Sequence, residues 1–351
     1  MIKSLVQDNR PILGLTIGDP SGIGPEITVK AVMDVALHKQ CRMMVIGDAG
    51  VVEDALAFCG LSARINRIAD PVDGVYAHGT IDILDLGNVD ITTLKMATVS
   101  REAGAAALAY IETGVDLALD GQLHGIVTAP IQKEAIHLAG CPHAGHTDII
   151  AHRTKTEIAT SMMCVGAFRV LHATLHVSMA DVARTLTRER VLHIIGLANS
   201  AVRELGIQSP RIGVAGLNPH SSDGGLFGDE EARIISPAIE DARLQGMNVT
   251  GPVPPDSMFM KLRGGAWDVC VAMYHDQGHI PVKMMGWYWE EAQRTWTQMS
   301  GVAVTVGLPI IRTNPDHGTA FEVAGKGIAN PQAMCEAIEV AVHMAHGRGL
   351  I

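Results

Sequence analysis

Residues 100–129 read SREAGAAALAYIETGVDLALDGQLHGIVTA and carry the clearest fold signal of the chain. Across residues 100–119 apolar residues recur three and four positions apart, which predicts an amphipathic helix, and Ser100 can cap its first turn. After a polar turn, GIVTA at 125–129 is a continuous apolar run of strand length. A helix followed by a fully apolar strand is typical of a parallel sheet that helices cover.

The same alternation continues on both sides of this segment. Residues 230–245 and 331–346 have the periodicity of helices. Further strands are predicted at PILGLTI (11–17), MMVIG (43–47), VLHATLHV (170–177), RIGVAGL (211–217), DVCVAMY (268–274) and GVAVTVG (301–307). Sequential strand–helix–strand units imply right-handed crossovers, so we predict an α/β fold with a mostly parallel sheet covered on both faces.

The length of 351 residues suits two domains or two lobes. No internal repeat or long polar linker separates them, so the division has to come from the chain crossing between lobes. We place the crossings near residue 129 and near residue 310. The first lobe is then 1–128 plus 311–351, and the second is 129–310.

Charge and composition exclude several classes of partner. The formal net charge is −10 and no long basic run is present, so nucleic acid is not expected as a partner. The N-terminal residues lack an apolar signal core, and no stretch of about 18 apolar residues offers a membrane span. We therefore expect a cytoplasmic protein. Its widely spaced cysteines are interpreted as reduced core thiols: Cys41, Cys59, Cys141, Cys164, Cys270 and Cys335.

Three histidines follow predicted strands. His176 closes HATLH, His220 lies in GLNPHSSDGG and His275 lies in AMYHDQGH. Neutral imidazole is a common ligand of borderline metals, and three such ligands leave a position open for water or substrate. The spacings of 44 and 55 residues are too long for a local motif, so ordinary polar residues at loop starts remain an equal interpretation.

Two cations lie near strand ends in the same way. Lys283 follows in HDQGHIPVK, and Arg312 lies in LPIIRTNPDHGT. Such side chains bind phosphate or carboxylate, Arg through its planar fork and Lys as a point charge. From these residues alone, each is more often a surface cation than a ligand.

Two glycine-rich stretches raise the question of a nucleotide. GDPSGIGPE at 18–26 does not have the GxGxxG spacing, and Pro25 replaces the third glycine, so we interpret it as a tight turn with a proline at the helix start. DHGTAFEVAGKGIANP at 316–331 offers small residues and polar donors after a predicted strand, which is weak evidence for a nucleotide site.

Taken together, these strings resemble the 4-hydroxythreonine-4-phosphate dehydrogenase family. GDPSGIGPE, GHTD at 145–148, GLNPH, YHDQG and GLPIIRT followed by DHGTA occur in the family's order, almost from end to end. The resemblance implies two α/β lobes of the isocitrate and isopropylmalate dehydrogenase type, with an active site shared across a homodimer. The second lobe then carries the metal ligands and the dimer interface.

The resemblance also implies roles for individual residues. The metal ligands are His176, His220 and His275, which hold a divalent ion (Zn, Mg, Co or Ni) between two subunits. The residues that bind a small anionic substrate are His146, Thr147, Lys283 and Arg312. Two catalytic candidates come from the sequence itself: Lys283 lies close enough to His275 along the chain to transfer a proton, and Asp256 in PPDSMF is an acidic neighbour. The NAD (or NADP) segment matches Asp316, His317, Gly318, Thr319, Gly325 and Gly327.

Two departures from the family pattern leave the substrate open. Ala303 in GVAVTVGLP replaces a substrate-binding Asn of the family, and a tryptophan-rich segment lies between Lys283 and Val302. The string GHIPVK is similar to the catabolic paralogues that act on 4-phosphothreonate, 4-phosphoerythronate or aromatic carboxylated cis-diols. The tryptophan-rich segment is equally well a lid, a dimer contact, a specificity loop or a locally packed excursion.

The expected reaction is oxidation of a secondary alcohol on a small phosphorylated hydroxy acid, with decarboxylation of the β-keto product. The alternatives are a dehydrogenase of an aromatic carboxylated cis-dihydrodiol, a non-redox metallohydrolase, which would also use three histidines and an open position, and a paralogue that binds a ligand without turnover.

Overall fold

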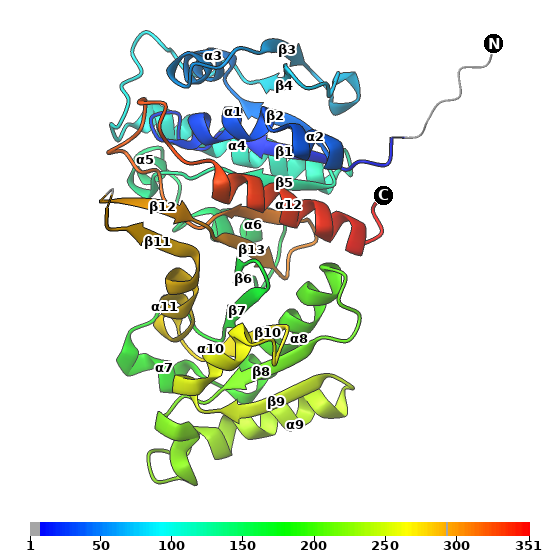
Figure 1. Ribbon diagram of the computed structural model, residues 1–351, viewed down its shortest axis with the longest axis vertical. Helices are drawn as coiled ribbons and strands as arrows, with labels where there is room; N and C mark the ends of the chain where they lie inside the picture. The colour runs from blue at the N-terminus through cyan, green and yellow to red at the C-terminus, as the bar shows by residue number, and fades with distance from the viewer. Residues whose placement is uncertain (1–7, 293) are drawn as a thin grey trace, which may run out of the picture. The chain divides into compact units, whose positions relative to one another are not determined.

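The computed structural model describes residues 8–292 and 294–351. By internal contacts the chain divides into unit 1, Met1–Lys155 with Pro309–Ile351, and unit 2, Thr156–Leu308 (Figure 1). The chain returns to unit 1 at residue 309, next to the crossing expected near residue 310. The first crossing lies later than the expected 129, because α5 (Lys133–Leu138) and α6 (His146–Arg153) pack against α4 (Arg101–Leu119) of unit 1.

Unit 1 contains a parallel sheet with the strand order β3-β4-β2-β1-β5-β14. The strands are β1 (Ile12–Thr16), β2 (Arg42–Gly47), β3 (Arg64–Ile68), β4 (Thr80–Asp85), β5 (Gly125–Thr128) and β14 (Arg312–Pro315). The other helices of the unit are α1 (Gly24–Val32), α2 (Val35–Gln40), α3 (Ala49–Phe58), α12 (Gln332–Gly347) and the short η1 (Pro71–Asp73). The apolar run of β5 is fully buried, as the sequence predicts.

Unit 2 has the strand order β13-β6-β7-β10-β8-β9, in which β7, β10, β8 and β9 are parallel and β6 is antiparallel to both neighbours. Its strands are β6 (Thr160–Val165), β7 (Phe168–His172), β8 (Arg211–Ala215), β9 (Asn248–Val253), β10 (Val269–Ala272) and β13 (Val302–Val306). Its helices are α7 (Met179–Thr185), α8 (Arg188–Glu204), η2 (Pro219–Asp223), η3 (Glu231–Ile235), α9 (Ser236–Leu244), α10 (Pro255–Arg263) and α11 (His275–Gly286).

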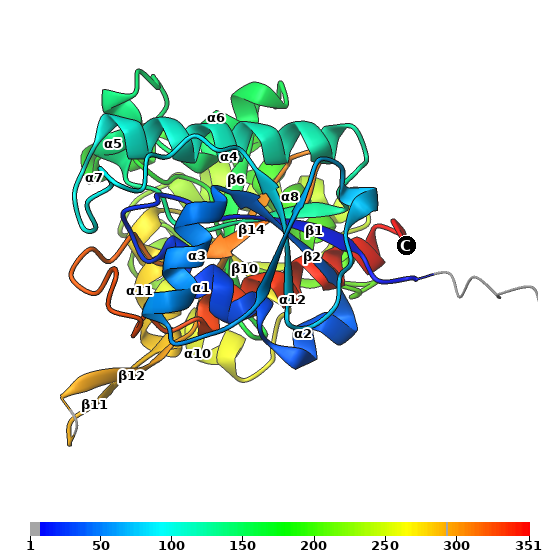
Figure 2. The same ribbon diagram turned by 90° about the horizontal axis from the view of Figure 1, so that it is seen from above.

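The tryptophan-rich segment forms an antiparallel hairpin of β11 (Trp287–Glu290) and β12 (Thr295–Met299). In Figure 2 the hairpin extends away from α11.

The α/β class and the mostly parallel sheets are confirmed. The helix predicted at 100–119 is α4, and the Ser100 side chain accepts a hydrogen bond from the Ala103 amide as its cap. The strand predicted at 170–177 corresponds to β7, which ends earlier, at His172. The sequence analysis did not predict the strands β3, β4, β6, β9 and β14 or the hairpin.

The loop at 18–26 is a tight turn, as the sequence analysis predicts. Gly18 has φ +69°, and a Cβ there would lie 2.2 Å from the Pro130 carbonyl oxygen. A Cβ at Gly24 would lie 2.1 Å from the Ile17 carbonyl oxygen, and Pro25 stands in the first turn of α1. These glycines therefore allow backbone segments to approach each other.

The cysteines are free thiols, as expected; Cys41, Cys164 and Cys270 are buried, and the other three are half-buried. No helix within residues 8–292 and 294–351 has the length and apolarity to cross a membrane.

Candidate functional site

Arg312 opens β14 and is the most deeply buried of the candidate substrate-binding residues, with 2% of its surface exposed. Its Nε and one terminal nitrogen donate hydrogen bonds to Thr128 Oγ1 at the end of the neighbouring β5, at 3.1 and 2.7 Å. Burial lowers the pKa of Arg312 to about 9. An anion beside the guanidinium would offset this desolvation, so the position favours an anionic ligand.

His146 and Thr147 begin α6, also in unit 1. The His146 Nε2 is buried and has no hydrogen-bond partner. Burial, and after it the positive charge of Arg312, lowers the pKa of His146 well below its ordinary value. The imidazole is therefore neutral at physiological pH. Two of the predicted substrate-binding residues, His146 and Arg312, thus lie near each other, and Thr128, which the sequence analysis did not select, orients the arginine.

Asp19, in the loop after β1, was also not selected. It is fully buried, and its Oδ1 accepts a hydrogen bond from the Ser21 amide at 2.8 Å. Its Oδ2 has no partner, nor do the Thr16 and Ser21 hydroxyls of the same region. Burial raises the pKa of Asp19 to about 6. An acidic residue directly after an apolar strand was the only sequence signal for it.

The segment expected to bind NAD wraps against α1. The Ile23 amide donates to the Thr319 carbonyl oxygen, and the Gly325 amide donates to Glu26 Oε1 at 2.6 Å. Gly325 has φ +75°, and a Cβ at Gly327 would lie 2.0 Å from the Phe58 carbonyl oxygen. Turn geometry and close backbone contact therefore explain these two glycines. Of the segment's expected residues, Thr319 is buried and Gly318 is exposed, while Asp316 and His317 are half-buried.

The three candidate metal ligands follow three adjacent parallel strands of unit 2. His176 lies four residues after β7, His275 opens α11 after β10, and His220 lies in η2 after β8, in the strand order β7-β10-β8. The rings of His176 and His275 have centroids 5.9 Å apart. Both line an opening of about 260 Å³ together with Tyr274, Asp276 and apolar residues of the loop before α7.

His220 occupies a strained turn. It and the next three residues, up to Asp223, all have positive φ, between 45° and 69°. Left-handed backbone at non-glycine residues costs free energy and is concentrated at functional sites. Within the part of the chain that the structure describes, no group of three or more His, Cys, Asp or Glu residues is arranged to hold a metal ion.

Two further histidines surround His275 and were not selected from the sequence. His279 stacks on it, with centroids 3.8 Å apart and an interplanar angle of 6°, and a hydrogen bond joins His279 Nδ1 to the His275 carbonyl oxygen. His172, at the end of β7, is buried with neither ring nitrogen hydrogen-bonded. The spacing of four residues between His275 and His279 on a helix could have indicated this pair.

The remaining predicted residues are placed as follows. Lys283 lies two turns after His275 on α11, with its Nζ 4.9 Å from the centroid of the Trp287 ring. Asp256 is exposed in the first turn of α10, a helix that packs against η2. Ala303 is 7% exposed in β13, within an apolar cluster that includes Met163 and Val282.

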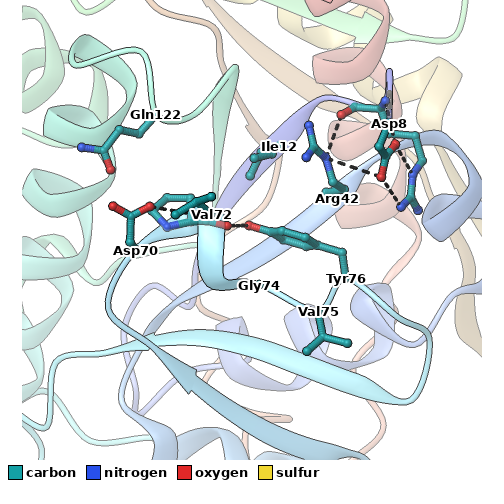
Figure 3. Close-up of a pocket in the computed structure, with 11 residues that line it drawn as sticks. Asp8, Ile12, Arg42, Asp70, Val72, Gly74, Val75, Tyr76 and Gln122 are labelled. Carbon is teal, nitrogen blue, oxygen red and sulfur yellow. Dashed lines mark hydrogen bonds and ion pairs between the residues drawn. The ribbon is translucent and has the colours of Figure 1, made fainter. Parts of the chain in front are cut away.

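A further cavity, of about 450 Å³, lies elsewhere in unit 1 (Figure 3). It is lined by Ile12 and Arg42, the first residues of β1 and β2, and so lies at the amino ends of the strands. Arg42 lies over the Tyr76 ring and pairs with Asp8. Ligands of parallel α/β sheets bind at the carboxyl ends, so this cavity is separate from the candidate site.

Comparisons with known proteins identify the family of this chain. The family model described as "Pyridoxal phosphate biosynthetic protein PdxA" matches residues 39–341. The chain belongs to the PdxA family. A protein of Symbiobacterium thermophilum, provisionally named D-threonate 4-phosphate dehydrogenase, is 43% identical over 338 residues, which cover 96% of this chain and 98% of that protein.

Two solved structures are also similar to this chain. The 4-hydroxythreonine-4-phosphate dehydrogenase of Klebsiella pneumoniae is 40% identical with a TM-score of 0.85, covering 96% of this chain and 98% of that one. A terephthalate 1,2-cis-dihydrodiol dehydrogenase of Burkholderia xenovorans is 30% identical with a TM-score of 0.67, covering 95% and 98%. The chain is therefore a dehydrogenase of the PdxA family.

Proposed function

We propose that this dehydrogenase oxidises the secondary alcohol of a small phosphorylated hydroxy acid, either 4-hydroxythreonine 4-phosphate or a 4-phosphorylated threonate or erythronate, with NAD or NADP as the hydride acceptor. The observation that carries the proposal is the buried Arg312, fixed by Thr128 and adjacent to a neutral His146. Such a guanidinium suits a phosphate or carboxylate. The names of the relatives contain 4-hydroxythreonine 4-phosphate and D-threonate 4-phosphate.

In this proposal, Arg312 binds an anionic group of the substrate and orients it. His146 contributes its free Nε2 to a substrate hydroxyl, with Thr147 beside it as a second hydrogen-bonding group. Lys283 binds a further anionic oxygen as an ammonium; in the alternative role, its neutral amine takes up the alcohol proton. The oxidised product is a β-keto acid, which loses CO₂ easily, so decarboxylation follows.

We also propose a divalent metal centre, with Zn, Mg, Co or Ni as candidates. His176, His220 and His275 fit as a donor set because all three are imidazoles at the carboxyl ends of adjacent strands. When bound, such an ion stabilises the developing charge of the alcohol oxygen. Since these ligands are not grouped among the described residues, we propose that two copies form a homodimer and share each centre.

The test is a spectrophotometric screen for NADH formation. The purified chain is mixed with NAD and a divalent ion, and then with 4-hydroxythreonine 4-phosphate, D-threonate 4-phosphate, 4-phosphoerythronate or an aromatic dihydrodiol acid. We expect a phosphorylated acid to reduce NAD, a chelator to abolish the rate, and added metal to restore it.

The screen separates the alternatives. Reduction of NAD by the dihydrodiol alone would replace the proposed substrate with that of the Burkholderia relative, which is 30% identical. Nucleotide binding with no reduction by any substrate would favour a paralogue that binds without turnover, for which Ala303 is the sequence hint. Metal-dependent hydrolysis of a phosphate ester with no NADH would favour the metallohydrolase.

A further inference from the structure

The tryptophan hairpin is joined directly to the helix that carries His275 and Lys283. Helix α11 ends at Gly286, and β11 begins at Trp287, whose amide donates to the Lys283 carbonyl oxygen. The Ser300 amide donates to the Gly286 carbonyl oxygen at 2.9 Å. A Cβ at residue 286 would lie 2.2 Å from the Ser300 carbonyl oxygen, so glycine allows this close contact. The root of the hairpin is therefore fixed against the end of α11.

Three tryptophans of the hairpin form a chain of ring contacts that ends at Lys283. The Lys283 ammonium lies 4.9 Å from the centroid of the half-buried Trp287 ring. Trp296 meets Trp287 edge-on, with centroids 5.5 Å apart. Trp289 meets Trp296 in the same way at 5.2 Å. Because Trp296 packs between them, the orientation of Trp287 is held by the opposite strand of the hairpin.

An aromatic ring restrains an ammonium group without neutralising it. A lysine stem loses rotamer entropy when it is ordered, and a cation–π contact offsets part of that loss before a ligand binds. A carboxylate at the same position would compete with an anionic substrate for the ammonium. Trp287 therefore restrains the Lys283 side chain without adding a negative charge beside it.

We propose that Trp287 is a positioning residue that holds the Lys283 ammonium for an anionic oxygen of the substrate, and that the hairpin serves to orient Trp287. The inference rests on the proposed function, since it takes Lys283 as a substrate-binding group. It gives the tryptophan-rich segment a role in substrate affinity, whereas the hydride transfer itself does not involve it.

The first test is kinetic. Trp287→Leu raises KM for the phosphorylated acid by roughly threefold to thirtyfold, the range of a cation–π contact, with little change in kcat. Trp287→Phe restores part of the affinity because it keeps a ring. Trp289→Leu is the matched control, since Trp289 contacts Trp296 but lies at the far end of the ring chain. A fall in kcat shared by Trp287→Leu and Trp289→Leu would overturn the proposal in favour of a structural role.

The second test needs no turnover. Lysine amines are dimethylated with ¹³C, and the resonance that disappears in Lys283→Met is assigned to Lys283. We expect a ring-current shift that Trp287→Leu removes, Trp287→Phe keeps in part and Trp289→Leu leaves unchanged. Inorganic phosphate, used as the probe, should move this resonance with a Kd threefold to thirtyfold weaker in Trp287→Leu.

The two readouts distinguish two kinds of failure. A Lys283 resonance or a phosphate Kd that Trp287→Leu leaves unchanged in a folded protein overturns the inference. If both change as expected while no candidate alcohol reduces NAD, the positioning of Lys283 stands and the proposed substrate is wrong.

Discussion

The two units place their candidate residues under opposite conditions. In unit 1, Arg312 and His146 are neighbours within one chain, and the hydroxyl of Thr128 fixes the arginine from the adjacent strand. In unit 2, His176 and His275 line an opening, while His220 occupies a separate strained turn. The candidate substrate-binding residues of unit 1 are thus positioned within one chain, whereas the proposed metal ligands of unit 2 are not grouped among the described residues.

The two units also differ in where their candidate residues lie relative to the strands. Unit 2 places its candidate histidines after parallel strands, whereas in unit 1 Arg312 is the first residue of β14 and Thr128 is the last residue of β5. In unit 1, β5 and β14 are paired, so Thr128 and Arg312 approach through the ladder itself. In unit 2 the loops after β7 and β10 bring His176 and His275 together, but His220 does not form a group of three ligands with them among the described residues. Pairing of adjacent strands is therefore sufficient to bring Thr128 and Arg312 together, but it is not sufficient to group the three histidines.

The largest effect of a single substitution should come from the preorganised arginine. Arg312→Ala is expected to lower kcat/KM by about a hundredfold, because each charge-assisted hydrogen bond to a ligand contributes roughly 1.5–3 kcal/mol. Arg312→Lys keeps the charge but loses the planar fork and should recover only part of the loss. Initial rates of NADH formation measure the effect, and the exposed Arg101→Ala is the control. An unchanged kcat/KM would remove Arg312 from the site.

The substitution Asp19→Asn tests whether a buried charge in unit 1 lowers the free energy of unfolding. Its folded-state pKa is raised to about 6, so its contribution to stability is present at low pH, when it is protonated, and is lost as the pH rises through 6. Asp19→Asn mimics the protonated form. It should therefore stabilise the protein above pH 6 by at most about 3 kcal/mol, and the gain should shrink toward pH 4.

Urea unfolding at pH 5, 6.5 and 8 measures this effect, with the exposed Asp120→Asn as the matched control. A less stable Asp19→Asn protein at pH 8 would show that the charged carboxylate is satisfied in solution by a partner. Unit 1 would then be less strained than its unpartnered oxygen suggests.

Ala303 tests the unit 2 sheet. The family places a substrate-binding Asn there, but in this chain the position is 7% exposed within an apolar cluster. Ala303→Asn should destabilise the fold by about 1–3 kcal/mol, because the new amide is buried without a partner. Thermal unfolding together with KM checks this. A stable variant with a lower KM would instead place residue 303 against the substrate.

The fold was largely predictable because its strands are buried on both faces, so their apolar runs stand out, as in β5, β10 and β13. Strands with exposed or polar positions, such as β3, gave no such signal. The boundary at Lys155 was missed because the packing of α5 and α6 against α4 is a tertiary fact that no local pattern records.

The resemblance selected Arg312 and His275 as candidates, but not the residues that contact them. Thr128 bonds to Arg312 and His279 stacks on His275, but threonine and histidine near strand ends are common for many reasons. The hairpin contact between Trp287 and Lys283 depends on the turn at Gly286, which only the structure shows. Sequence patterns indicate functional groups more readily than the residues that orient them.

Complementation between inactive variants tests the shared metal centre most directly. His176→Ala, His220→Ala and His275→Ala are each inactive in this account, and they are mixed in pairs after dissociation and reassociation. If two ligands come from one copy and the third from the other, two of the three pairings regain activity, to about a quarter of the wild-type rate, because half of the dimers are hybrids with one intact site. Recovery in none of the pairings, or full activity in His220→Ala alone, would contradict a three-histidine centre shared by two copies.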